Sequence, residues 1–265
     1  MQAFTRNGTT LHYSLRGNVS DPALVFSNSL GTDFRIWDQV ADGLPPDLCI
    51  LRYDKRGHGL SDLPEGEWGM ADHVADLSGL MDHLGLQAAV ICGLSVGGMI
   101  AQGLAAERRD LVRALILCDT GAKIGTPEMW QERIETALGA GLSAMADGVM
   151  QRWFTEPFRT ADPTFPIWHN MLCRTTPGGY AGTCQAIADT DLQESTSRLR
   201  VPCLGICGAQ DGATPPDLVR ETTALIPGSR FELIKDAGHI PCVEQPERTT
   251  ELIAGFLSEI GHITT

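Results

Sequence analysis

The sequence predicts an α/β protein in which a mostly parallel sheet is flanked by helices and interrupted by a helical insertion. Short, fully apolar runs predict strands that are buried on both faces, as parallel strands are. These runs alternate with stretches of helical periodicity up to about residue 120, and the alternation resumes near residue 200. We therefore expect one core domain, residues 1–120 and 199–265, with residues 121–198 inserted as helices.

The elements before residue 120 alternate between short strands and helices. Residues 10–15 alternate in polarity, which is typical of a strand with one buried face. Two later apolar runs follow Pro22 and the Pro45–Pro46 pair, so turns separate them from what precedes. In chain order, the predicted elements are strands at residues 10–15, 23–26 and 49–53, a helix at 72–84, a strand at 88–92, a helix at 96–106 and a strand at 114–118.

The second half of the chain begins with the insertion and then returns to the first pattern. Within the insertion, residues 129–138 and 144–154 have the clearest helical patterning. After it, the predicted elements are a strand at residues 201–207, a helix at 217–226, a strand at 230–234 and a helix at 247–260.

Composition and charge exclude several classes of protein. Of the 265 residues, 43% are hydrophobic and 20% charged, which excludes disorder of the whole chain. The formal net charge of −13 argues against nucleic acid or an anionic membrane surface as partner. An anionic small substrate would need cations placed locally in its pocket.

The eight cysteines and the N-terminus favour a reducing, cytoplasmic setting. No cysteine pair has CxxC or zinc-finger spacing, and several lie inside apolar runs, so we interpret them as free thiols. Residues 1–6 lack the apolar segment of a signal peptide. Residues 84–106 carry no charge, but glycines interrupt them, and they are better explained as a strand, a turn and a helix than as a membrane span.

The motif that carries chemistry is Gly93-Leu94-Ser95-Val96-Gly97, a G-x-S-x-G pattern between a predicted strand and a predicted helix. Glycines allow a sharp turn there, which would place the Ser95 hydroxyl at the N-terminus of the helix. Developing negative charge is favoured at that position. Ser95 is therefore the candidate nucleophile, and the alternative is a tight turn with an inert serine.

A serine nucleophile needs a base and an acid, and His239 and Asp211 are the candidates. Each follows its own predicted strand, and the order serine, aspartate, histidine is that of hydrolases built on this type of turn. His58 is the rival base, but it precedes the serine. The alternatives are a surface histidine and a turn aspartate.

Two backbone N–H groups should form the oxyanion hole. One is that of Val96, which follows the nucleophile, and the other should come from the loop at residues 27–33. We assign the second donor to Leu30; the alternative is an ordinary turn.

These residues together resemble the α/β-hydrolases over nearly the whole chain and, more narrowly, the 3-oxoadipate enol-lactonases. The segments that resemble the narrower family are residues 27–33, 53–59, 92–98, 122–130 and 180–184. The resemblance implies an α/β-hydrolase fold whose insertion forms a helical cap, with Ser95 as nucleophile, Asp211 as acid and His239 as base. It also implies hydrolysis of a small anionic enol-lactone to 3-oxoadipate in the β-ketoadipate pathway of aromatic catabolism, without metal or organic cofactor.

The carboxylate of such a substrate would need a cation. We name Arg133 and the neighbouring Trp130 as predicted pocket residues, although a solvated charge and a packed tryptophan are the plain alternatives. The other cations near the oxyanion loop and insertion are Arg35, Lys123, Arg159 and Arg174.

Two other functions fit the same residues. One is a serine esterase, lactonase or perhydrolase-like enzyme with another small substrate, because specificity depends on the insertion. The second is a sensor that keeps the fold and binds a small acid without catalysis. A haloalkane dehalogenase is disfavoured because that chemistry needs aspartate at position 95.

Overall fold

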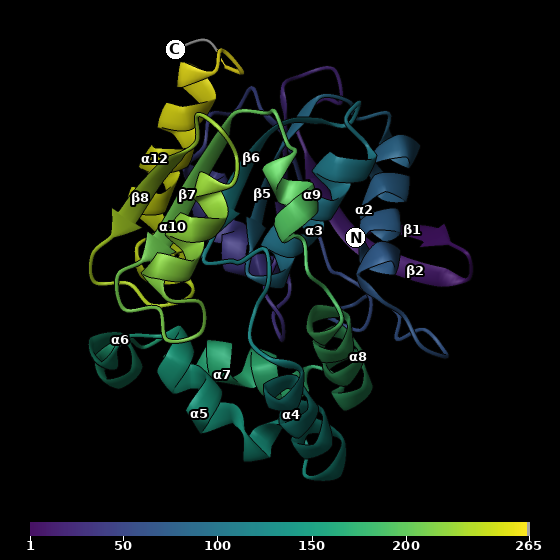
Figure 1. Ribbon diagram of the computed structural model, residues 1–265, viewed down its shortest axis with the longest axis vertical. Helices are drawn as coiled ribbons and strands as arrows, with labels where there is room; N and C mark the ends of the chain where they lie inside the picture. The colour runs from purple at the N-terminus through teal and green to yellow at the C-terminus, as the bar shows by residue number, and fades with distance from the viewer. Residues whose placement is uncertain (264–265) are drawn as a thin grey trace.

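An eight-stranded sheet forms the centre of the computed structural model, which describes residues 1–263 (Figure 1). The strand order is β1-β2-β4-β3-β5-β6-β7-β8, in which β2 is antiparallel to both of its neighbours and all other neighbours are parallel. The predicted mostly parallel α/β sheet is therefore confirmed. The strands are β1 (Gln2–Arg6), β2 (Thr9–Arg16), β3 (Ala23–Ser27), β4 (Cys49–Tyr53), β5 (Ala89–Leu94), β6 (Val112–Cys118), β7 (Cys203–Gly208) and β8 (Arg230–Ile234).

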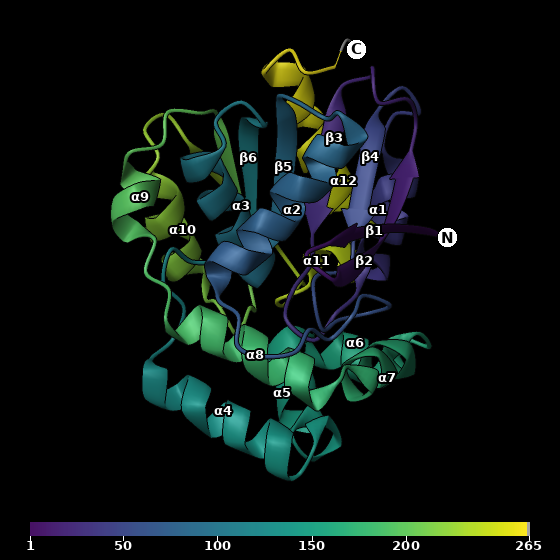
Figure 2. The same ribbon diagram turned by 90° about the vertical axis from the view of Figure 1, so that its right-hand side faces the viewer.

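Helices cover both faces of the sheet (Figure 2). Helices α2 and α3 pack together on one face, and α1 and α12 pack together on the other. Every residue of β3, β5 and β7 is buried, which explains why the central strands read as continuous apolar runs. The elements around the sheet are η1 (Phe34–Trp37), α1 (Asp38–Gly43), α2 (Met70–Leu84), α3 (Val96–Glu107), α9 (Gln193–Ser197), α10 (Pro216–Ala224), α11 (Pro241–Glu244) and α12 (Pro246–Glu259).

The differences from the sequence prediction have local causes. The prediction omitted β1, whose side chains are exposed or only half-buried, so its sequence carries little apolar signal. It also omitted the short α1 and α11. The β5 strand runs two residues beyond its predicted end, to Leu94, and therefore delivers the chain directly into the turn at Ser95.

The insertion contributes a layer of helices beyond one end of the sheet, at the bottom of Figure 1. Three of these helices begin with the same device, in which a threonine caps the first turn and proline follows within the next two residues: Thr126, Thr155 and Thr176. In this part of the chain the elements are α4 (Pro127–Gly139), η2 (Leu142–Ala144), α5 (Ala146–Trp153), α6 (Glu156–Ala161), α7 (Phe165–Arg174) and α8 (Pro177–Ala188). The helix that follows, α9, packs on α3 instead. Across residues 1–263, no helix combines the length and apolar character needed to cross a membrane.

Candidate active site

Ser95 lies at the sharp turn between β5 and α3. Its backbone adopts φ 57° and ψ −120°, a strained conformation for a residue with a side chain. A Cβ atom on Gly93 would lie 2.2 Å from the carbonyl oxygen of Gly97, and one on Gly97 would lie 2.1 Å from the carbonyl oxygen of Ser27. Both glycines are therefore required by close backbone contact, and the structure has the strand, turn and helix that the motif predicted.

Asp211 and His239 form a buried hydrogen-bonded pair. Asp211 lies in the loop after β7 and His239 in the loop after β8, and Nδ1 of His239 is 2.9 Å from Oδ2 and 3.1 Å from Oδ1 of Asp211. Asp211 is 5% and His239 1% exposed. The structure thus brings together the predicted acid and the predicted base from two loops that are 28 residues apart in sequence.

The Asp211 carboxylate is held in one orientation by further donors. Its Oδ1 accepts the backbone N–H groups of Ala213 at 2.7 Å and Thr214 at 3.0 Å. Its Oδ2 lies 2.7 Å from the Thr214 hydroxyl. Burial alone would raise the pKa of Asp211, but the charge of His239 and the hydrogen bonds from His239, Ala213 and Thr214 outweigh it and lower the pKa. Asp211 is therefore an ionised partner for the imidazole.

Ser95 is joined to this pair through neighbouring loops. Among residues 1–263 the structure has no hydrogen bond between Ser95 and His239, and Nε2 of His239 lies 3.5 Å from the Ser29 hydroxyl. The Thr120 hydroxyl donates to the Ser95 carbonyl at 2.6 Å, and the adjacent Asp119 carbonyl lies 2.7 Å from the Thr214 hydroxyl. Bonds between a nucleophile and its base are often long without substrate, so this arrangement is compatible with a catalytic role.

Asp119 is an acidic residue of this site that the sequence analysis missed. It follows β6 directly, so the end of a buried strand, as for Ser95 and Asp211, was the available signal. One carboxylate oxygen accepts the Gly208 N–H at 2.8 Å, and the other is buried without a hydrogen-bond partner in the described chain. Burial, followed by the negative charge of Asp211, raises the pKa of Asp119 well above its usual value. We interpret Asp119 as a neutral acid next to the ionised Asp211.

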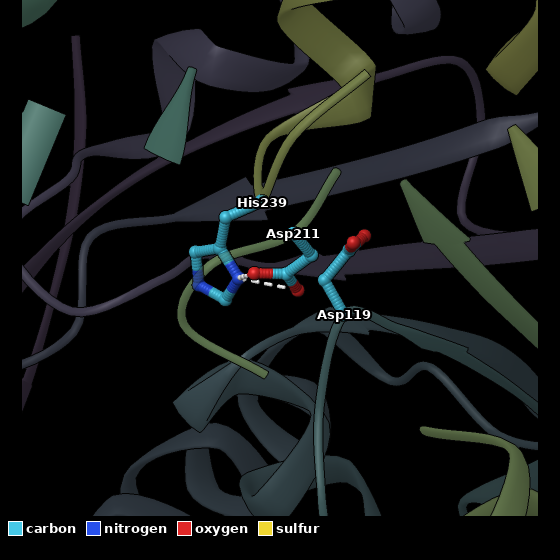
Figure 3. A group of neighbouring side chains, drawn as sticks. All are labelled: Asp119, Asp211 and His239. Carbon is cyan, nitrogen blue, oxygen red and sulfur yellow. Dashed lines mark hydrogen bonds and ion pairs between the residues drawn. The ribbon is translucent and has the colours of Figure 1, made fainter. Parts of the chain in front are cut away.

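Asp119, Asp211 and His239 place one possible ligand atom each within 4.8 Å of one another, which is the spacing of a metal site. Their orientations do not suit one. In Figure 3 the imidazole and the Asp119 carboxylate lie on opposite sides of Asp211. Both Asp211 oxygens already accept hydrogen bonds, so the group is better explained as a hydrogen-bonded acid–base pair with a neutral neighbour.

The loop after β3 offers the second predicted oxyanion donor. The N–H of Leu30 has no hydrogen-bond partner in the described part of the chain. Val96 is the first residue of α3, where N–H groups have no preceding turn to bind. The side chain of Ser29 lies beside His239, so this loop borders the base. Both predicted donors are therefore available.

Helix α5 from the insertion is hydrogen-bonded to the loops that carry Asp211 and His239. The carbonyl of Trp153 accepts the N–H of His239 at 2.8 Å, and the carbonyl of Arg152 accepts the N–H of Gly212 at 3.2 Å. A Cβ atom on Gly31 would lie 3.2 Å from the Tyr180 ring and 3.4 Å from the Trp153 ring. Helix α5 thus contacts the loop at residues 27–33 as well as the loops of Asp211 and His239, and α8 contacts the first of these.

Two guanidinium groups without acidic partners lie on the inserted helices, Arg133 on α4 and Arg152 on α5. Arg133 stacks on Trp130 at 5.2 Å, and no Asp or Glu of the described chain forms an ion pair with Arg133 or Arg152. The Tyr180 hydroxyl is buried and makes no well-aligned hydrogen bond in residues 1–263, although it lies close enough to the Arg133 guanidinium to interact with it. Burial raises the pKa of Tyr180 to about 12, while the charges of Arg133 and Arg152 oppose that shift, which places both cations near the phenol. Burial and the charge of Arg133 lower the pKa of Arg152.

The structure places the other sequence candidates away from this cluster or in satisfied contacts. Arg35 pairs with Asp33 at 2.6 Å, and Lys123 pairs with Asp191 at 3.1 Å. Arg174, together with Arg35, lines a cavity of about 540 Å³ whose lining does not include the triad candidates. The Arg159 guanidinium donates to the Phe154 carbonyl. Trp130 donates to the Ile124 carbonyl at 2.6 Å, so its indole N–H is already used.

Comparisons with known proteins define the class to which this fold and site belong. A model of the alpha/beta hydrolase family matches residues 24–252, and the chain belongs to that family. Among its members, 3-oxoadipate enol-lactonase 2 of Acinetobacter baylyi is 35% identical over 97% of this chain and 96% of the relative. The crystal structure of the enol-lactonase from Burkholderia xenovorans LB400 superposes with a TM-score of 0.93 at 37% identity, covering 97% of this chain and all of that one.

A thermophilic esterase from Thermogutta terrifontis is also similar, with a TM-score of 0.91, 29% identity and coverage of 98% and 99% of the two chains. The resemblance that the motifs predicted is confirmed at the level of the family.

Proposed function

We propose that the protein is a serine hydrolase that opens 3-oxoadipate enol-lactone to 3-oxoadipate. The observation that carries the proposal is the buried Asp211–His239 pair beside the strained turn at Ser95. The similarity to enol-lactonases over nearly the full chain supports the choice of substrate.

The reaction would use side chains and backbone groups alone. Ser95 Oγ attacks the lactone carbonyl carbon while Nε2 of His239 takes its proton, and Asp211 stabilises the resulting imidazolium through Nδ1. The N–H groups of Leu30 and Val96 hold the oxyanion, each contributing ~3 kcal/mol by comparison with other hydrolases. The single bond between the carbonyl carbon and the ring oxygen then breaks, and the imidazolium protonates the released enolate oxygen. Water, activated by His239, cleaves the acyl-enzyme, and the enol product tautomerises to the ketone.

The substrate carboxylate would bind to residues of the inserted helices α4, α5 and α8. Arg133 is one of the five cations that the sequence offers for this role, and Arg152 and Tyr180 lie near it in the structure. The lack of acidic partners leaves both guanidinium groups able to bind an anion, and the Tyr180 hydroxyl near Arg133 adds a donor. This local positive charge offsets the net charge of −13, which would otherwise repel an anionic substrate.

The test is the loss of enol-lactone ultraviolet absorbance with purified protein, corrected for spontaneous hydrolysis. We expect turnover by the wild type and a loss of several orders of magnitude in kcat in Ser95→Ala, with the fold retained. If the wild type shows no turnover above background while a fluorophosphonate still labels Ser95, the protein remains a hydrolase but the lactone is not its substrate.

A serine esterase is the second candidate function, because the similar esterase has the same fold at 29% identity. A panel of p-nitrophenyl esters separates the two. Much faster hydrolysis of simple esters than of the enol-lactone would favour the esterase. Failure of fluorophosphonate to label Ser95 would instead favour a non-catalytic sensor.

All eight cysteines are free in the structure, in keeping with our proposal that the enzyme acts in the cytoplasm.

A further inference from the structure

Lys55 is a buried cation that the reaction described above does not use. It lies in the loop after β4 and is 1% exposed. In the described chain no Asp or Glu forms an ion pair with it; its ammonium group donates instead to the carbonyl of Ser29 at 2.5 Å and lies 3.5 Å from that of Thr32. Burying an ammonium group against neutral carbonyls costs stability. A buried lysine of this kind is therefore a candidate for a functional role.

The carbonyl that Lys55 binds belongs to the peptide whose N–H is the proposed oxyanion donor. The Ser29–Leu30 peptide is trans, so its C=O and N–H point in opposite directions. Lys55 and the Thr32 hydroxyl, which donates to the same carbonyl at 2.9 Å, both lie on the C=O side. The Leu30 N–H therefore points away from Lys55, and it has no partner in the described chain.

A positive charge at the carbonyl oxygen also changes the peptide electronically. It draws electron density from the amide nitrogen through resonance, which makes the N–H a stronger donor. The contact with Thr32 lets the same ammonium group hold both ends of the turn from Ser29 to Thr32, and the Asn28 side chain donates to the Thr32 carbonyl at 3.0 Å as well.

We propose that Lys55 is a positioning residue that orients and polarises the Ser29–Leu30 peptide so that the Leu30 N–H stabilises the oxyanion. This inference rests on the proposed function, because it takes Leu30 as an oxyanion donor. Lys55 touches no reacting atom and acts only through the peptide.

The electrostatic surroundings set the pH range in which Lys55 carries the charge that this role requires. Burial lowers the pKa of Lys55 to about 7, and the charges of Asp54 and Asp33 oppose the shift. Burial is also the main reason that the pKa values of His58 and His73 are lowered, and the charge of Lys55 contributes to both shifts. The ammonium group is therefore only partly protonated at neutral pH, and the polarisation of the Ser29–Leu30 peptide is complete only below about pH 7.

The experiment compares Lys55→Met with the wild type, because methionine keeps the chain length and removes the charge. Removing a whole oxyanion donor costs about 10²–10³ in kcat, so loss of its support should cost about 10- to 100-fold. KM should change less than about threefold, since the ground-state carbonyl uses the donor weakly. Affinity for phenylboronic acid, which forms a tetrahedral adduct with the serine, should fall by the same factor as kcat. Lys235→Met, at an exposed lysine, is the matched control and should change neither quantity.

The readouts separate this inference from the proposed function. Hydrolysis of p-nitrophenyl acetate and boronate binding depend on the serine and the oxyanion hole, so both can be measured even if the enol-lactone is not a substrate. A folded Lys55→Met protein with unchanged kcat and boronate affinity would overturn the role of Lys55. So would equal losses in boronate binding and in binding of the product, 3-oxoadipate, because a general distortion of the pocket produces that pattern.

Thr32→Val provides a second variant in case Lys55→Met does not fold. It removes the hydroxyl that donates to the same Ser29 carbonyl, keeps the shape of the side chain and leaves the longer backbone N–H contact of Thr32, at 3.4 Å, in place. We expect kcat and boronate affinity to fall together by about two- to fivefold, the effect of weakening one neutral hydrogen bond. No change in either quantity would show that the Ser29 carbonyl does not control the oxyanion donor and would overturn the inference.

Discussion

The Asp211→Asn substitution tests the proposed triad most directly, because the structure determines how the new side chain must sit. Oδ1 of Asp211 accepts two backbone N–H groups, from Ala213 and Thr214. Oδ2 is the oxygen closest to Nδ1 of His239, at 2.9 Å. An asparagine therefore keeps its carbonyl oxygen at the Oδ1 position, since the opposite orientation would set its NH2 group against two N–H donors.

In that orientation the asparagine NH2 group donates to Nδ1 of His239. The imidazole proton must then reside on Nε2, which is the nitrogen that should accept the Ser95 proton. The variant thus loses the correct tautomer as well as the negative charge that stabilises the imidazolium. In a related triad this change lowers kcat by about 10⁴, which corresponds to about 5 kcal/mol of transition-state stabilisation.

The assay is the initial rate of enol-lactone or p-nitrophenyl acetate hydrolysis, with circular dichroism and thermal melting to confirm the fold. The matched control is Asp119→Asn, a change of the same size at the neighbouring carboxyl. A loss of less than tenfold in Asp211→Asn would refute the reasoning, and a large loss in Asp119→Asn alone would move the acid to the residue after β6.

Three further outcomes are expected. Asp119→Asn keeps the acceptor for the Gly208 N–H and should stay within about threefold of wild-type activity. The melting temperature of Asp119→Asn relative to the wild type should rise from pH 4 to pH 8. The pKa of Asp119 is raised in the folded protein, so the protonated carboxyl contributes fully to stability below the unfolded pKa of about 3.9. The wild type loses that contribution as the pH rises through the folded pKa, and the asparagine variant does not. A pH-independent difference would contradict this. Arg152→Met should raise KM for the enol-lactone by about 10- to 100-fold, the value of a charge-assisted hydrogen bond, and leave p-nitrophenyl acetate hydrolysis nearly unchanged. Equal effects on both substrates would remove Arg152 from the carboxylate site. Arg35→Met, at an arginine paired with Asp33, should leave both rates unchanged in the same assay.

Much of the fold was predictable because its signals are local. The buried strands β3, β5 and β7 are almost entirely apolar, so short apolar runs bounded by turns identified them. The turn at Ser95 was predictable for a similar reason: only glycine fits at positions 93 and 97, where backbones approach within contact distance. The edge strand β1 was not, because its half-exposed side chains carry no comparable pattern.

The surroundings of the candidate triad depend on contacts between distant segments. Asp119 gives only a weak local signal, and its raised pKa follows from burial beside Asp211, 92 positions later in the chain. No sequence pattern distinguishes Arg152 from a surface arginine, because its place near the site depends on the contacts of α5 with the loops of Asp211 and His239.

The sequence by itself determined the α/β class, the sharp turn at Ser95 and the order of serine, aspartate and histidine, because these depend on backbone sterics and on side-chain polarity along the chain. The tertiary structure alone decided which cations lack acidic partners and which carbonyl the buried Lys55 binds. Those properties depend on the distances between loops that parallel strands bring to one edge of the sheet, and no local pattern encodes such distances.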